Sequence, residues 1–232
     1  MTPRRIVILT GAGVSAESGV PTFRAADGLW EGHRVEDVAT PEAFQRDPDT
    51  VQRFYDARRR FLAQVDPNPA HLALARLDLA FDGDLLLVTQ NVDDLHERAG
   101  SRRLIHMHGE LLRALCQSCG TSGAWTANLI DRPPCPTCDA ATLRPDIVWF
   151  GEMPYQMARI EQAIVGCDLF VSIGTSGAVY PAAGFVRQAR AAGAYTMEMN
   201  LEPSAGSAWF AETRFGPAGQ LVPAWVDGLL GQ

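Results

Sequence analysis

The chain has 232 residues, of which 47% are hydrophobic and 20% are charged. This balance is typical of a folded globular protein and not of a disordered one. The formal net charge is −7, and no basic block exists beyond 58–60, so nucleic-acid binding has little electrostatic support. No apolar run has the length of a signal-peptide core or a membrane span. We expect a cytoplasmic protein with no nucleic-acid or membrane partner; a monomer is favoured.

Apolar, β-prone runs alternate with helical patterns along the chain. The runs lie at 4–10, 84–91, 102–109, 146–151, 168–177 and 194–200, and the helical patterns at 48–65, 69–79, 155–166 and 182–192. Strands that alternate with helices predict an α/β fold, a Rossmann-like parallel sheet with helices on both faces. Ligands bind such sheets beyond the carboxyl ends of the strands, so the loops that follow these runs should converge on one crevice.

A glycine-rich turn follows the first run. It reads Gly11-x-Gly13-x-x-Ala16, a spacing that brings backbone N–H groups close to a pyrophosphate, although such turns also serve only to pack a helix on a strand. The ordinary dinucleotide fold continues to a second strand that ends in an acidic residue. Here "PTFRAADGLWEGHR" takes that place and is turn-rich. The pattern therefore favours a nucleotide site and disfavours a dehydrogenase.

The helix expected at 48–65 has Asp47 as its cap and Pro48 in its first turn. Its apolar residues recur at the spacing of one helical face: Val51, Phe54, Tyr55, Phe61, Leu62 and Val65. Arg58 falls inside this stripe, whereas Arg59 and Arg60 point elsewhere. Either Arg58 extends along the apolar surface to water, or it meets an anion there.

Two histidines, His106 and His108, stand two residues apart and share one face of the run at 102–109. Histidine is the natural general base near neutral pH. The periodicity alone does not choose between the two residues.

Four cysteines form two C-x-x-C pairs, Cys116 with Cys119 and Cys135 with Cys138, separated by fifteen residues. This spacing predicts a four-thiolate zinc site, whereas a redox C-x-x-C needs only one pair. Four thiolates leave no open position on zinc, so the metal should be structural. We expect 116–142 to be an inserted zinc-binding module in a Rossmann-like nucleotide-binding domain that comprises 1–115 and 143–232.

The segments "GAGVSAESGVPTFR", "TQNVDDLH", "HGE", "VWFGE", "GTS" and "NLE", with both cysteine pairs between them, occur in this order. In this set the chain resembles the sirtuins, NAD-consuming protein-lysine deacylases, over nearly its whole length. The resemblance implies that the acyl oxygen of a modified lysine attacks C1′ of the nicotinamide ribose and that nicotinamide leaves. A ribose hydroxyl then attacks, and water releases lysine and O-acyl-ADP-ribose. At position 22 this chain has threonine, where many sirtuins have aspartate. Threonine at this position is found in the class of sirtuins that removes acidic acyl groups.

The resemblance also implies site residues. It places the general base at His108, with Asn91 as a second catalytic residue. It places NAD against Gly11, Ala12, Gly13, Ser15, Ala16, Phe23, Arg24, Trp30, Gln90, Asn91, Val92, Asp93, Gly174, Thr175, Ser176, Asn200, Glu202 and Ala218. The peptide should lie beside the strand edge formed by Val148, Phe150, Gly151 and Glu152, because backbone pairing binds extended peptides.

Tyr55 and Arg58 match the pair by which succinyl- and malonyl-removing sirtuins recognise their substrates. Arginine offers a two-pronged donor set to a carboxylate, and tyrosine adds one more donor. We therefore expect removal of succinyl and malonyl groups from lysine, with acetyl groups also accepted. The alternatives are an ADP-ribosyltransferase that uses the same crevice and a non-catalytic zinc-knuckle module that binds acyl-lysine.

Overall fold

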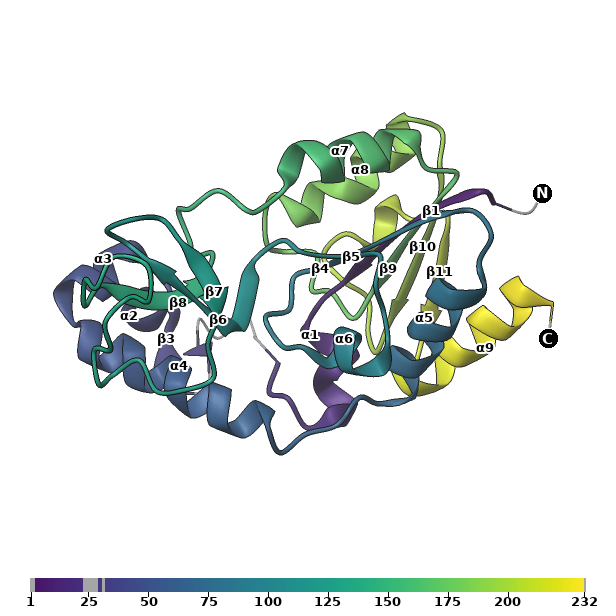
Figure 1. Cartoon of the computed structure of the whole chain (residues 1–232). Coiled ribbons are helices and arrows are strands. Elements are labelled where there is room, and N and C mark those ends of the chain that lie inside the picture. The colour runs from purple at the N-terminus through teal and green to yellow at the C-terminus, as the bar shows by residue number, and fades with distance from the viewer. Residues whose placement is uncertain (1–2, 23–28, 31, 232) are drawn as a thin grey trace.

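The computed structural model describes residues 3–22, 29–30 and 32–231 (Figure 1). A parallel sheet has the strand order β11-β10-β9-β1-β4-β5. Its members are β1 (Arg5–Thr10), β4 (Asp84–Thr89), β5 (Leu104–His106), β9 (Leu169–Ile173), β10 (Tyr195–Asn200) and β11 (Glu212–Phe215). All neighbouring strands run parallel. The expected parallel sheet is confirmed.

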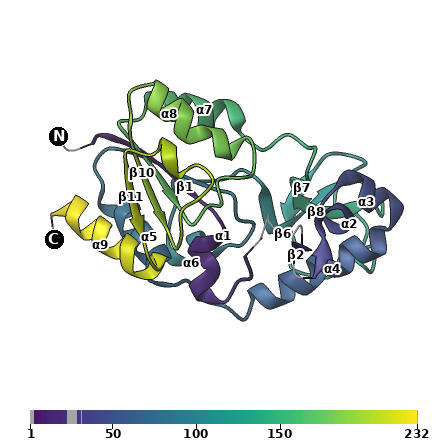
Figure 2. The same ribbon diagram turned by 180° about the vertical axis from the view of Figure 1, so that it is seen from behind.

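Helices cover both faces of this sheet, as Figures 1 and 2 show. The helices α5 (Pro69–Ala80) and α9 (Ala218–Leu230) pack on the face to which Ile6 and Ile8 point. The helices α7 (Met157–Gly166) and α8 (Phe185–Ala191) cover the opposite face, with Val7 and Leu9. Successive residues of β1 are therefore buried on opposite faces, which explains why its sequence is continuously apolar.

A second, antiparallel sheet lies beside the first, with the strand order β7-β6-β8. It consists of β6 (Gly109–Cys116), β7 (Ser122–Ala124) and β8 (Leu143–Ile147). The helices α2 (Val35–Val38), α3 (Pro41–Arg46) and α4 (Pro48–Leu62) share a separate apolar core with residues of β6 and β8. The remaining elements are short: α1 (Ala12–Ser15), η1 (Ala16–Ser18), β2 (Leu29–Trp30), β3 (His33–Arg34), α6 (Leu95–Ala99), η2 (Ala182–Gly184) and η3 (Ser207–Trp209).

The helices predicted from the sequence are present, and their bounds differ from the predicted ones by a few residues. The Asp47 carboxylate caps α4 by accepting the Thr50 N–H, and the helix ends at Leu62, three residues early. Among the described residues, we find no helix of the length and apolar character that crossing a membrane requires.

The strand expected at 146–151 is wrong in its position. The strand is β8, which ends at Ile147, and 148–152 form the turn that follows it. Two local features bend the chain there: the Glu152 carboxylate accepts the Trp149 N–H at 2.8 Å, and Gly151 has φ of +93°. A positive φ is readily adopted only by glycine.

Candidate active site

A cavity of about 930 Å³ opens at the carboxyl ends of the parallel strands, between the two sheets. The expected convergence of the strand-end loops is confirmed. Most of the predicted site residues line this cavity: Gly11, Ala12, Gly13, Gln90, Asn91, Val92, Asp93, His108, Val148, Phe150, Gly151, Glu152, Gly174, Thr175, Ser176, Asn200 and Glu202. Tyr55 and Thr22 line it as well.

Glycine at 11 and 13 lets two loops approach closely at the floor of the cavity. A Cβ at Gly13 would lie 2.7 Å from the Gly174 Cα, and one at Gly11 would lie 2.8 Å from the Gly174 oxygen. The Gly13 N–H donates to that same oxygen at 2.8 Å. The close approach leaves a shallow backbone surface without side chains, which suits the pyrophosphate of a dinucleotide.

The segment that follows β4 lies between the cavity and the chain at 106–111. Its successive carbonyl oxygens at Gln90, Asn91 and Val92 accept hydrogen bonds from His108 Nδ1, His106 Nδ1 and the Leu111 N–H, at 3.1, 3.0 and 2.8 Å. One side of the segment is thus fixed by three carbonyls, while its other side lines the cavity.

His108 differs from His106 in its surroundings. Because the Gln90 oxygen only accepts, His108 Nδ1 carries the proton, and Nε2 keeps its lone pair. The ring is half-buried on the cavity wall, and burial lowers its pKa from the ordinary value of 6.5 against the opposing effect of the Gln90 bond. His108 is therefore a neutral base at neutral pH and is able to take a proton from a group in the cavity.

Ser15 connects the polar side chains of the segment after β4. Its hydroxyl accepts from Asn91 Nδ2 at 3.0 Å and donates to Asp93 Oδ2 at 3.0 Å. Asp93 is 5% exposed, and burial raises its pKa. These bonds hold an amide and a carboxylate at the cavity wall, although Ser15 lies behind the described lining.

Other predicted NAD residues differ in where the structure places them. Asn200 supports the neighbouring loop, because its Nδ2 donates to the Thr175 oxygen at 2.7 Å. Within the described part of the chain, Ala16 and Ala218 lie outside the cavity lining. The predictions for Phe23 and Arg24 lie outside the described residues, and Trp30 is placed only as a residue of β2.

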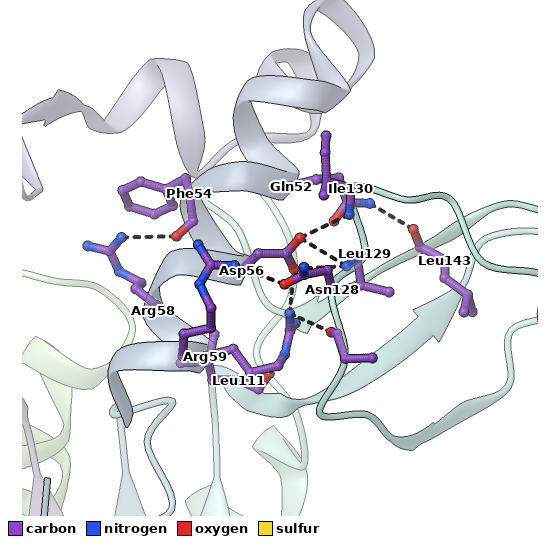
Figure 3. A network of polar contacts seen from close by, with 12 residues as sticks. Gln52, Phe54, Asp56, Arg58, Arg59, Leu111, Asn128, Leu129, Ile130 and Leu143 are labelled. Atoms are coloured by element: carbon purple, nitrogen blue, oxygen red, sulfur yellow. Dashed lines mark hydrogen bonds and ion pairs between the residues drawn. The ribbon is translucent and has the colours of Figure 1, made fainter. Parts of the chain in front are cut away.

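Tyr55 and Arg58 are both buried on α4, where they are 0% and 6% exposed. The Tyr55 hydroxyl accepts a hydrogen bond from Trp149 Nε1 at 3.0 Å. The Arg58 guanidinium lies over the Phe54 ring, with Cζ 3.5 Å from the ring centroid, and is turned away from Asp56 (Figure 3). The arginine predicted to interrupt an apolar face is thus buried, one helical turn from a residue that lines the cavity.

Arg59, which the helical pattern directed away from the apolar stripe, is also buried, at 4% exposure. Its Nη1 donates to Asp56 Oδ1 at 2.6 Å and its Nε to the Leu111 oxygen at 3.0 Å. The Asp56 carboxylate also accepts the N–H groups of Leu129 and Ile130, at 2.9 to 3.0 Å (Figure 3). Both sides of α4 are therefore covered. The Asp-x-x-Arg spacing is the one sequence signal for this pair.

Replacing Asp56 with asparagine should destabilise the protein, because the amide keeps only one acceptor oxygen for these donors. We expect the loss of a hydrogen bond to a charged group to cost about 1.5–3 kcal/mol, or a Tm lower by about 3–12 °C. Asp49→Asn is the matched control: Asp49 lies on the same helix, and its ion pair with Arg132 is exposed. Calorimetry on both variants measures the difference. Equal shifts would contradict the role of Asp56 in joining α4 to 127–130.

The four predicted zinc ligands meet at one point. Their sulfur atoms all lie within 4.8 Å of one another, with Cys116–Cys138 at 3.7 Å and Cys119–Cys135 at 3.8 Å. A tetrahedron with Zn–S bonds of about 2.3 Å has edges of about 3.8 Å. The cysteines therefore fit one zinc ion with a complete ligand set, which ties the turn at 116–119 to the turn at 135–138.

The Glu152 side chain bonds to groups close to it in the sequence. Both of its carboxylate oxygens lie 2.9–3.0 Å from Arg144 Nη2, and Oε2 accepts the Trp149 N–H. Arg144 stacks over the Trp149 ring, with Cζ 4.0 Å from its centroid. These contacts fix the ring whose N–H reaches Tyr55, so Glu152 both lines the cavity and holds the neighbouring wall in place.

The model of the Sir2 family matches residues 11–181 of this chain. The chain belongs to the Sir2 family. A relative from Escherichia coli strain K12, an NAD-dependent protein deacylase, is 58% identical over 99% of this chain and 84% of its own length. A relative from Vibrio cholerae with the same name is 56% identical over 98% of this chain and 94% of its own length. The chain is accordingly a sirtuin, an NAD-dependent protein deacylase.

Solved sirtuin structures have the same fold. A Sir2 homologue in complex with NAD is 39% identical, with a TM-score of 0.90 over 98% of this chain and 90% of the other. A complex of Sir2 with a p53 peptide and NAD is 27% identical, with a TM-score of 0.83 over 97% and 93% of the two chains. NAD supplies the electrophilic C1′ carbon of its nicotinamide ribose, and acyl-lysine proteins or peptides are the second substrate.

Proposed function

We propose that this sirtuin removes succinyl and malonyl groups from lysine, accepts acetyl groups as well, and yields nicotinamide and O-acyl-ADP-ribose. One observation carries the preference for acidic groups. It is the burial of the Arg58 guanidinium one helical turn from Tyr55, a residue of the cavity wall. The proposal goes beyond the general deacylase activity of the relatives.

The chemistry of the pair supports this substrate class. Arginine stays protonated when buried, and a carboxylate is the ligand that best matches its planar donors. Burial raises the pKa of Tyr55 further above its ordinary value of 10.0, so the phenol is neutral at working pH. Since its oxygen accepts from Trp149, its own hydrogen is directed to another acceptor. A carboxylate at the end of a short acyl chain would accept from both side chains.

We propose the following division of the cavity. Gln90, Asn91 and Asp93 hold the ribose and the carboxamide of the nicotinamide half, where His108 serves as the base for a ribose hydroxyl. Loops 11–13 and 174–176 hold the phosphates, and Asn200 and Glu202 hold the adenosine ribose. The peptide lies along 148–152, where Phe150 is 47% exposed. The polar groups of 90–93 and the segment 148–152 line the same cavity, which supports this arrangement.

The first test compares matched peptides that carry succinyl-lysine and acetyl-lysine at the same position. With NAD present, kcat/KM for each peptide is measured by mass spectrometry of the released lysine peptide. We expect the succinyl peptide to be preferred by at least tenfold, about 1.4 kcal/mol. Preference for acetyl would contradict the acidic-acyl proposal and leave the deacylase activity intact. ADP-ribosylated peptide as the product would instead favour a transferase.

We also propose that the protein works in the cytoplasm as a monomer, without nucleic-acid or membrane partners. Four thiolates that bind zinc need a reducing compartment, which supports the first point. A net charge of −7 disfavours binding to nucleic acid and to anionic membranes.

A further inference from the structure

His106 is bonded at both of its ring nitrogens. Nδ1 lies 3.0 Å from the Asn91 carbonyl oxygen, and Nε2 lies 2.5 Å from Glu97 Oε1. The His106 side chain is 8% exposed and that of Glu97 is 40% exposed. A carbonyl and a carboxylate both accept hydrogen bonds, and a neutral imidazole has only one N–H. The imidazolium form satisfies both acceptors, and its charge is balanced by Glu97.

Carboxyl groups predominate among the titratable groups that face His106, and they favour this charged form. The facing groups are Glu97 and His96 on α6, Asp93 and Asp94 in the preceding loop, and Glu110 on β6. Burial alone would lower the pKa of His106, but the bond to Glu97 and the charge of Glu97 outweigh it, so the pKa is raised. His96 is fully buried, and burial keeps its pKa well below 6.5, so it adds no competing charge.

We propose that His106, held as an imidazolium by Glu97, is a positioning residue for the deacylase reaction: it fixes the Asn91 carbonyl and thereby the placement of Asn91 and Asp93 at the cavity wall. In a neutral ring the remaining N–H would donate to the carboxylate, which is the stronger acceptor. The lone pair of Nδ1 would then face the Asn91 oxygen at 3.0 Å, and the segment 90–93 would have to move. The inference rests on the proposed placement of NAD against this segment.

Two substitutions separate the two bonds of His106. The amide nitrogen of asparagine occupies nearly the place of Nδ1, so His106→Asn keeps a donor for the Asn91 oxygen and gives up Glu97. Glutamine instead places its amide near Nε2, so His106→Gln keeps the contact with Glu97 and leaves the Asn91 carbonyl without this donor. We expect kcat/KM for NAD to stay within about threefold in His106→Asn and to fall about tenfold to a hundredfold in His106→Gln. The KM for the acyl peptide should change little in either variant.

The pH dependence gives a second readout. Since the folded-state pKa of His106 is raised above 6.5, the pair stabilises the protein fully below that ordinary value and loses its effect as pH rises through the raised value. Wild-type activity should therefore fall on the alkaline side, and Glu97→Gln should move this fall to lower pH. His106→Asn has no group to titrate here and should lack it.

Thermal melting of each variant and the Kd for NAD, measured by calorimetry, complete the experiment. Equal losses in His106→Asn and His106→Gln, matched by equal drops in Tm, would overturn the positioning role and leave a structural one. Unchanged activity in His106→Gln would overturn it as well. If wild-type protein failed on every acyl-lysine peptide while NAD Kd still rose only in His106→Gln, the proposed function would fail and the positioning role would stand.

Discussion

Replacement of His108 with asparagine should lower kcat for deacylation by about 10²–10⁴-fold, the usual contribution of a general base. Asparagine is the informative choice because its amide nitrogen near Nδ1 still donates to the Gln90 oxygen, now 3.1 Å from the ring. The variant loses only the unprotonated nitrogen on the cavity side. The segment at 90–92 therefore keeps its support, and the Kd for NAD should stay within a few-fold of wild type.

Two measurements distinguish loss of the base from loss of the site. In the proposed reaction, nicotinamide release precedes the step that needs the base, so a first turnover of nicotinamide should persist with acyl peptide while release of lysine is lost. In the wild type, protonation of His108 removes the base, and burial lowers its pKa below 6.5. Activity should therefore be lost on the acid side only as pH falls below 6.5. An acid-side loss of activity centred above pH 6.5, or weak NAD binding by His108→Asn, would contradict the assignment.

Much of the fold follows from local sequence signals. The runs at 4–10 and 84–91 are apolar without alternation, which is the pattern of parallel strands buried on both faces, and both form neighbouring strands of the sheet. Asp47 followed by Pro48 marks the start of α4 because the cap needs one acceptor and the first turn needs no N–H. The zinc ligands could also be predicted from the sequence, because a four-cysteine site is recognised by residue type and spacing alone.

What the sequence did not show depends on contacts between distant segments. The hydrophobic periodicity of α4 does not predict that β6 and the loop at 127–130 cover a second side of the helix. The burial of Arg59 was therefore not predicted. Similarly, strand alternation places His106 and His108 on the same face and does not distinguish them. They differ only because the carbonyls of Asn91 and Gln90 face them and because Glu97 stands beside one of them.

Arg58→Met should reduce kcat/KM for a succinyl-lysine peptide by two to three orders of magnitude. Removing one partner of a buried charge pair costs about 3–5 kcal/mol, and each 1.4 kcal/mol corresponds to about tenfold. Methionine keeps an apolar side chain of similar length over the Phe54 ring, so the loss should come from the missing charge. Deacetylation should change far less, because an acetyl group carries no carboxylate.

The ratio of the two activities makes this test specific. Arg53→Met removes an exposed arginine from the same helix and should leave both activities within about twofold, as expected for a surface substitution. If Arg58→Met lowers both activities equally and lowers Tm, Arg58 supports the fold through its contact with Phe54. If it lowers desuccinylation alone, the buried charge acts on the substrate, since of the two peptides only the succinyl-lysine peptide carries an acyl carboxylate. An arginine in an apolar stripe then marks the preference of the enzyme for acidic acyl groups.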